Sequence, residues 1–252
     1  MPRYDFRAPR LYLDTPLRPG AELPLAAPQA HYLEHVLRLK NGDSVLVFNG
    51  REGEWRAILA AGAKRRLHLA IGEQARAQTA PGDLHYLFAP LKRARLDYMA
   101  QKAVEMGVSA LCPVLTHHTQ AERVNVERLR ANAIEAAEQC GILTVPQVAA
   151  PLPLATALDA LAPARRLIFC DEDAPVADPL AALRAAMPAE RRQPVPLAVL
   201  VGPEGGFSTE ERALILRRPQ AVRLALGPRI LRADTAAVSV LALVQAVLGD
   251  WR

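Results

Sequence analysis

Two short apolar segments, each followed by a loop of glycine and proline, constrain the fold of this chain more than any other feature. The first, at 197–201, is an uninterrupted apolar run that leads into GPEGG at 202–206. The second, at 221–226, leads into Gly-Pro at 227–228. Continuous apolar runs of this length are typical of strands that are covered on both faces of a sheet. The two segments therefore predict two buried strands.

The sequence between and after these strands predicts helices. Ser208 and Glu211 have the spacing of a capping box, which begins a helix before the second strand. A strand–helix–strand alternation indicates a parallel α/β sheet. Because sheets of this kind bind ligands at the carboxyl ends of their strands, the two loops are the predicted site.

Composition limits the class of protein. A chain of 252 residues, 51% of them hydrophobic, is long enough for two domains with ordinary cores. No apolar run is long enough to span a bilayer, and the charged N-terminus does not resemble a signal peptide. Three widely spaced cysteines favour reduced thiols in a cytoplasm over disulfides or zinc. We therefore expect a cytoplasmic protein with neither a membrane nor a metal partner.

The positive charge lies mostly in the first third of the chain. The first 72 residues carry 11 Lys/Arg against 7 Asp/Glu, whereas the other 180 carry 20 against 19. In the same region a helical pattern at 27–39 is followed by short strands at 44–48, 55–60 and 67–71, which predict a small β-barrel. Lys64, Arg65 and Arg66 are interpreted as a solvated hairpin tip. An excess of positive charge favours a polyanionic partner.

A polar segment at 74–82, ending in Pro-Gly, is the predicted linker. After it, strands at 84–89, 110–115 and 167–170 alternate with helices at 92–106 and 126–139. Residues 171–173, Asp-Glu-Asp, are interpreted as exposed charges after a strand. The uncharged stretch 235–249 predicts a buried final helix that takes part in a subunit interface. The domains are then 1–73, the linker 74–82, and 83–252.

Two common site types do not match. GPEGG lacks the GK[ST] of a phosphate-binding P-loop, and it is not the GxGxxG of a dinucleotide fold. His117 and His118 follow a predicted strand, but no Asp, Glu or Cys lies nearby at ligand spacing. We therefore expect neither nucleotide binding of these kinds nor a metal.

The two loops together resemble a known family. GPEGG, followed one helix and strand later by LGPRILRADTA at 226–236, is similar to the ribosomal RNA small subunit methyltransferase E family. HYLEHVLRLKNGD at 31–43, KRARLDYMAQKAVEMGV at 92–108 and EAAEQ at 135–139 extend the resemblance over nearly the whole chain. Two positions depart from the family: Ile142 occupies a region that usually holds an arginine, and Asp234 stands where glutamate is common.

The resemblance implies a fold, an activity and partners. The fold is an N-terminal PUA-like β-barrel followed by a SPOUT domain, a parallel α/β domain with a trefoil knot. The activity is S-adenosylmethionine-dependent methylation of uridine N3 in 16S rRNA of the small ribosomal subunit, by a homodimer.

The resemblance also implies site residues. The cofactor pocket would be formed by Leu200, Gly202, Pro203, Glu204, Gly205, Gly206, Leu226, Gly227, Ile230, Leu231, Arg232, Thr235 and Ala236. RNA contacts would come from Arg10, His31, Arg38, Lys40, Lys92, Arg93 and Lys102. Because N3 must lose a proton, Arg232 and Arg10 are the predicted cations that stabilise the resulting charge, with Glu204 or Asp234 orienting the base or accepting the proton.

Two alternatives stay open at this point. One is a SPOUT methyltransferase that acts on the ribose 2′-oxygen, although such enzymes typically have an SLN-type motif where this chain has LRAD at 231–234. The other is an RNA-binding ribosome-assembly factor without catalytic activity. Intact glycines in both loops disfavour the second.

Overall fold

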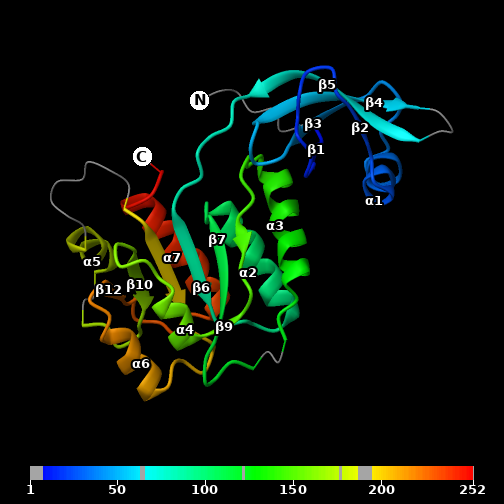
Figure 1. Cartoon of the computed structure of the whole chain (residues 1–252). Coiled ribbons are helices and arrows are strands. Elements are labelled where there is room, and N and C mark those ends of the chain that lie inside the picture. The colour runs from blue at the N-terminus through cyan, green and yellow to red at the C-terminus, as the bar shows by residue number, and fades with distance from the viewer. Residues whose placement is uncertain (1–7, 63–65, 121–122, 176–177, 187–194, 252) are drawn as a thin grey trace. The chain divides into compact units, whose positions relative to one another are not determined.

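The chain folds into two compact units, which we describe separately. The computed structural model describes residues 8–62, 66–120, 123–175, 178–186 and 195–251 (Figure 1). Unit 1 consists of residues 1–80 together with 137–145, and unit 2 consists of residues 81–136 together with 146–252. Within the described residues, no helix has the length and apolar character needed to cross a membrane.

Unit 1 contains a five-stranded sheet in the order β1-β3-β4-β5-β2. β1 and β3 are parallel, and the other neighbouring pairs are antiparallel. The sheet covers a core that includes Leu33, Val47, Leu59 and Leu69. Its elements are β1 (Arg10–Tyr12), β2 (Glu22–Pro24), α1 (Ala27–His31), the π-helical turn η1 (Tyr32–Val36), β3 (Ser44–Phe48), β4 (Glu54–Ala61) and β5 (Leu67–Arg76).

The predicted helix at 27–39 differs from the observed structure. α1 ends at His31, and a wider π-helical turn follows, in which the Leu37 amide donates to the Tyr32 carbonyl at 2.9 Å. The wider turn directs Leu33 and Leu37 toward the core, whereas Val36, predicted on the same side, is 59% exposed.

The first residues of the predicted linker belong to a strand. β5 continues to Arg76 because the Arg76 guanidinium pairs with the buried Glu54 carboxylate, with Nε 2.7 Å from Oε2. Of the predicted basic hairpin tip, Lys64 and Arg65 lie outside the described residues.

Unit 2 is built on a seven-stranded sheet in which every recorded pair is parallel. The order is β12-β10-β11-β6-β7-β8, with β9 also pairing with β7. Its elements are β6 (Leu84–Phe88), α2 (Arg93–Glu105), β7 (Ala110–Leu115), α3 (Val126–Cys140, whose last turn belongs to unit 1), β8 (Gln147–Val148), β9 (Leu152–Pro153), α4 (Leu154–Asp159), β10 (Arg166–Cys170), α5 (Pro179–Ala185), β11 (Leu197–Val201), α6 (Thr209–Leu216), β12 (Ala221–Leu224) and α7 (Ala233–Val247).

Helices cover both faces of this sheet, which explains its continuous apolar strands. Leu200 and Phe169 face a cluster with Leu158 of α4 and Ile215 of α6. On the other face, the hydroxyl of buried Tyr86 donates to the Met99 sulfur of α2 at 3.2 Å. α7 packs against α2, α5 and β11. The predicted mixed α/β fold with a parallel second sheet is therefore confirmed. The trefoil knot stays a prediction.

Candidate functional site

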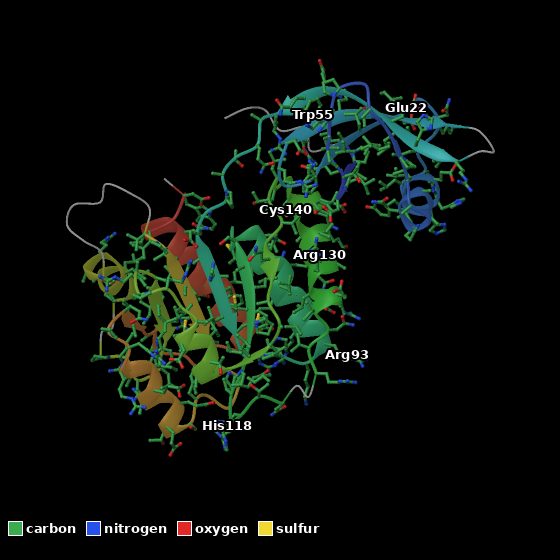
Figure 2. All side chains as sticks on the ribbon, in the orientation of Figure 1. Glu22, Trp55, Arg93, His118, Arg130 and Cys140 are labelled. Carbon is green, nitrogen blue, oxygen red and sulfur yellow. The ribbon has the colours of Figure 1, made fainter. Side chains whose placement is uncertain are left out.

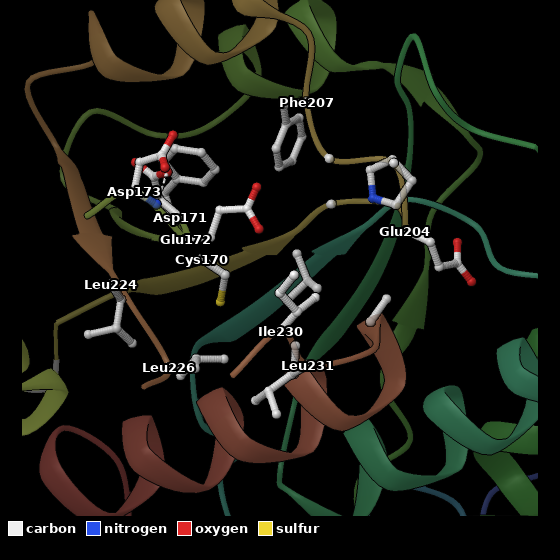
Figure 3. Close-up of a pocket in the computed structure, with 18 of the residues that line it drawn as sticks. Cys170, Asp171, Glu172, Asp173, Glu204, Phe207, Leu224, Leu226, Ile230 and Leu231 are labelled. Carbon is white, nitrogen blue, oxygen red and sulfur yellow. Dashed lines mark hydrogen bonds between the residues drawn. The ribbon is translucent and has the colours of Figure 1, made fainter. Parts of the chain in front are cut away.

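Three neighbouring strands end at one pocket. The loops after β10, β11 and β12 enclose a cavity of about 460 Å³, and most of its lining is drawn in Figure 3. β10 lies between β11 and β12 in the sheet, so its loop lies between the two loops that the sequence singled out. A cavity of this size at the carboxyl edge of a parallel sheet is suited to a ligand as large as a nucleoside derivative.

The loop after β11 approaches its surroundings so closely that two of its glycines have little room for a side chain. A Cβ atom on Gly202 would lie 2.6 Å from the Phe207 ring, and one on Gly205 would lie 3.2 Å from the His118 Cβ. Gly206 has a φ of +69°, which favours glycine. The pocket wall here consists largely of backbone.

Hydrogen bonds anchor this loop to its neighbours. The predicted capping box is confirmed: Ser208 Oγ accepts from the Glu211 amide at 3.2 Å, and Glu211 Oε2 accepts from the Ser208 amide at 3.0 Å. Glu211 Oε1 also accepts from the His117 amide at 2.7 Å. His118 Nδ1 lies 3.2 Å from the Gly206 carbonyl oxygen, which requires the Nδ1–H tautomer for a hydrogen bond. His118, labelled in Figure 2 on the loop after β7, thus contacts the glycine loop, and His117 contacts the first turn of α6.

The loop after β12 forms the opposite wall. The strand ends at Leu224, two residues earlier than predicted, so Leu226 belongs to the loop. Gly227 turns the chain with a φ of +96°. Ile230 lines the cavity although it is 92% exposed, an unusual position for a large apolar side chain.

The loop after β10 was interpreted as exposed charges, and the structure corrects this for Asp171. The Asp171 side chain is 2% exposed. It accepts from Arg212 Nη2 of α6 at 3.1 Å and from Arg223 Nε of β12 at 2.7 Å. These two guanidinium groups compensate the cost of burying the carboxylate. The sequence did not predict that Asp171 is buried, because Arg212 and Arg223 are distant from it along the chain.

Cys170, at the end of β10, also lines the cavity. Burial raises the pKa of its thiol to about 12, with the Asp171 charge adding to the shift. The thiol is therefore protonated at neutral pH and is no nucleophile. No group of three His, Cys, Asp or Glu residues in the described ranges could hold a metal ion.

Most of the predicted cofactor residues lie together around the cavity. The lining includes Gly202, Pro203, Glu204, Gly205, Gly206, Leu226, Gly227, Ile230, Leu231 and Ala236. Leu200, Arg232 and Thr235 are not part of it. Leu200 is fully buried between the sheet and its helices. The lining also includes residues that the sequence analysis did not predict, among them Phe207, Arg212 and the whole segment 169–173.

The predicted catalytic residues have different surroundings. Arg232 is exposed at the N-terminus of α7 and forms no ion pair with any described residue. Glu204 Oε1 lies 3.3 Å from Arg95 Nη1 of α2. Asp234 Oδ1 accepts from the Thr235 amide at 2.9 Å.

Arg10 occupies a structural position. It is 7% exposed, and its Nε donates to Oε1 of the buried Glu54 at 3.1 Å. A guanidinium buried in an ion pair is not available to RNA or to a reacting base in this conformation. This observation disfavours both roles that were predicted for Arg10.

The other predicted RNA contacts lie near the surface of each unit. In unit 1, His31, Arg38 and Lys40 are exposed. In unit 2, Lys92 precedes α2 and Arg93 begins it, as Figure 2 shows for Arg93. Lys102 forms an ion pair with Glu105 at 2.7 Å, one turn away on α2.

Comparison with known proteins agrees with this architecture. Family models match two stretches of the chain: an RNA methyltransferase domain at residues 78–245 and an RNA methyltransferase PUA domain at residues 25–72. Fold and pocket thus define the class of RNA methyltransferases that carry a PUA domain.

Curated relatives narrow the class to one family. A ribosomal RNA small subunit methyltransferase E from Synechocystis is 32% identical over 234 residues, which cover 90% of this chain and 74% of that protein. One from Rickettsia conorii is 29% identical and covers 94% of each chain. The chain belongs to the ribosomal RNA small subunit methyltransferase E family.

Two solved structures are similar over nearly the whole chain. The family member from Neisseria gonorrhoeae, bound to S-adenosyl methionine, has a TM-score of 0.82 and 26% identity and covers 98% of this chain and 100% of its own. A methyltransferase from Legionella pneumophila, also solved with this cofactor, has a TM-score of 0.77 and 27% identity, with coverage of 95% and 98%.

Proposed function

We propose that this protein transfers a methyl group from S-adenosylmethionine to N3 of a specific uridine in 16S rRNA of the small ribosomal subunit. The observation that carries the proposal is the cavity at the ends of β10, β11 and β12, in a chain related to a protein solved with this cofactor. The finer choice of N3 and of uridine rests on the family resemblance of the two loops.

The pocket is suited to S-adenosylmethionine, which supplies an electrophilic methyl group. A Cβ on Gly202 or Gly205 would crowd Phe207 or His118. Because both positions are glycines, the loop backbone itself can face a ligand. The backbone groups of this loop can hydrogen-bond the polar edges of an adenosine moiety. Leu226, Ile230 and Leu231 offer apolar contacts to its rings.

Arg232 is our candidate for stabilising charge on the base. When N3 loses its proton, the negative charge spreads onto the neighbouring carbonyl oxygens, so a cation directed at those oxygens lowers the barrier. Arg232 is suited to this role because it lies next to the loop 226–231 and forms no ion pair with a described residue. Holding the two reactants in line contributes as well.

Glu204 or Asp234 would orient the uracil or accept its proton. Glu204 lies in the cavity wall, 3.3 Å from a guanidinium nitrogen of Arg95. Asp234 lies in the first turn of α7, next to the loop after β12.

RNA binding would use cations near the surface of each unit, of which Lys102 is half-buried and paired with Glu105. We propose His31, Arg38 and Lys40 on unit 1, and Lys92, Arg93 and Lys102 on unit 2, as contacts to phosphate or base. Arg10 is left out because of its buried ion pair.

We further propose a cytoplasmic homodimer. α7 carries no charge after Asp234, and Leu243 and Val247 are only half-buried in a single chain. A second copy that packs on α7 would cover these side chains.

The test uses radiolabelled S-adenosylmethionine and small ribosomal subunits from a strain that lacks this gene, followed by digestion and separation of nucleosides. Label in 3-methyluridine is the expected result. Label in a 2′-O-methyl nucleoside would instead identify a ribose methyltransferase. Absence of both label and cofactor binding would favour a non-catalytic assembly factor.

A further inference from the structure

The acidic residues of the pocket wall differ in whether their charge is compensated. Asp171 is held by Arg212 and Arg223. Glu204 is paired with Arg95. Glu172 lies in the same wall, yet it forms no ion pair with any described residue. It therefore contributes a net negative charge to the cavity.

The backbone around Glu172 is fixed on both sides. The Asp171 amide donates to the Leu224 carbonyl at 3.0 Å, and the Asp173 amide donates to Asp171 Oδ1 at 3.2 Å. Figure 3 shows the Glu172 carboxylate extended toward the interior of the pocket, away from the carboxylates of Asp171 and Asp173. The backbone of Glu172 is thus anchored through the buried Asp171, while its own side chain is exposed and forms no ion pair with the residues that the structure describes.

The cations of the wall do not neutralise Glu172. Arg212 is engaged by Asp171 and lies 3.7 Å from an Asp173 oxygen. Arg229 lies on the exposed loop after β12. Among the described residues of the lining, neither Arg212 nor Arg229 forms an ion pair with Glu172, and the other lining residues are largely glycines and apolar side chains.

We propose that Glu172 lets the pocket distinguish the cofactor from its product by charge. S-adenosylmethionine carries a sulfonium, an ammonium and a carboxylate, for a net charge of +1. After the methyl group has left, the sulfur is a neutral thioether and S-adenosylhomocysteine has no net charge. An unpaired carboxylate in the wall attracts the first more than the second, which promotes release of the product. This inference rests on the proposed function, because it takes S-adenosylmethionine as the ligand.

The experiment measures three dissociation constants by isothermal titration calorimetry on the full chain and on Glu172→Gln, which keeps the shape and removes the charge. The ligands are S-adenosylmethionine, S-adenosylhomocysteine and sinefungin, whose amine replaces the methylated sulfur and retains the charge. We expect the variant to bind the two cationic ligands about three- to tenfold more weakly, with less than about a twofold change for the neutral product.

Other outcomes overturn the inference. An equal loss for all three ligands would place Glu172 on the adenosine or the α-ammonium group that they share, and no loss for any ligand would remove it from recognition. If the unaltered chain binds none of the three, the proposed function fails together with the inference.

Glu127→Gln is the matched control. It removes the same charge from the exposed first turn of α3 in the same unit, outside the cavity lining. All three dissociation constants should stay unchanged in this variant. An effect of the control equal to that of Glu172→Gln would mean that overall charge, and not Glu172, determines the preference.

Discussion

Asp171 and Glu172 are neighbours with the same functional group, but their surroundings give them different roles. Asp171 is buried against two arginines and holds the loop after β10 in place. Glu172 has no such partner among the described residues and is directed into the pocket. The same contrast separates Arg10, buried against Glu54, from Arg232, which is exposed beside the site. A charged side chain that is buried in an ion pair holds the structure together, whereas one without such a partner is available to interact with a ligand.

Arg10→Ala should lower the free energy of unfolding by about 2 kcal/mol. Breaking a buried ion pair usually costs more, but Arg76 also contacts Glu54 and would still compensate part of its charge. Chemical denaturation measures the change, and cofactor affinity should remain unaltered. Unchanged stability with weakened RNA binding would restore the role that the sequence predicted for Arg10.

Arg232→Ala should reduce the rate constant of methyl transfer roughly 100-fold, the typical effect of removing one group that stabilises a developing anion. The dissociation constant of the cofactor and the midpoint of thermal unfolding should change little, because the side chain lies outside the cavity lining. Single-turnover methylation of small subunits gives the rate. Arg217→Ala, at the exposed end of α6, is the control for loss of a surface cation. Near-full turnover of Arg232→Ala would remove Arg232 from the mechanism.

At the scale of elements, α6 connects three parts of the site. Its capping box fixes the end of the glycine loop. Glu211 accepts from the His117 amide after β7, and Arg212 donates to Asp171 after β10. The first turn of one short helix thus sets the relative positions of three loops at the sheet edge.

Ser208→Ala should destabilise the protein by about 1 kcal/mol, the usual cost of losing an N-cap side chain. The loss frays the turn that carries Glu211 and Arg212, so cofactor affinity should fall as well. Thermal unfolding and calorimetric titration measure the two effects. Thr209→Ala is the control, because Thr209 is the exposed next residue and its hydroxyl forms no recorded hydrogen bond. Equal effects of both variants would contradict a capping role.

The elements of unit 2 were predictable where a local pattern determines them. The apolar run of β11 and the capping box of α6 appear in the structure with the predicted bounds. The loop after β10 was not predictable, since Asp171 finds Arg212 and Arg223 at separations of 41 and 52 residues. In unit 1, the π-helical turn replaced a predicted helix because core packing overrides a weak helical pattern. The conformation of the loop after β10 therefore depends on ion pairs between residues that are far apart in the sequence, which local patterns do not reveal.

On the scale of the whole molecule, unit 1 is not a continuous stretch of chain. Residues 137–145 belong to it. The Tyr12 amide donates to Glu138 Oε1 at 2.8 Å, and Arg76 Nη2 donates to the Gly141 carbonyl at 3.0 Å. Leu143, in the same segment, is 4% exposed. A division of the chain near residue 80 therefore removes part of the first unit.

A fragment of residues 1–80 should accordingly unfold at a lower temperature than unit 1 in the full chain, because these hydrogen bonds and the segment with Leu143 are absent. Circular dichroism against temperature measures this. Adding a peptide of residues 134–147 in excess should raise the midpoint, since a ligand that binds only the folded state stabilises it. A fragment as stable as unit 1 in the full chain would contradict this dependence.

The order of strands in unit 2 also determines when the site can form during synthesis. Leu84 of β6 pairs with Leu197 of β11, 113 residues later, and the pocket is closed only by residues up to Ala236. During synthesis, the edge of β6 that pairs with β11 stays unpaired until β11 has been made. Pairing between strands so far apart in the sequence is slow, and an unpaired strand edge is prone to aggregation. A nascent chain that still lacks β11 and β12 has no such pocket, so the cofactor cannot bind before the last strand of the sheet has been made.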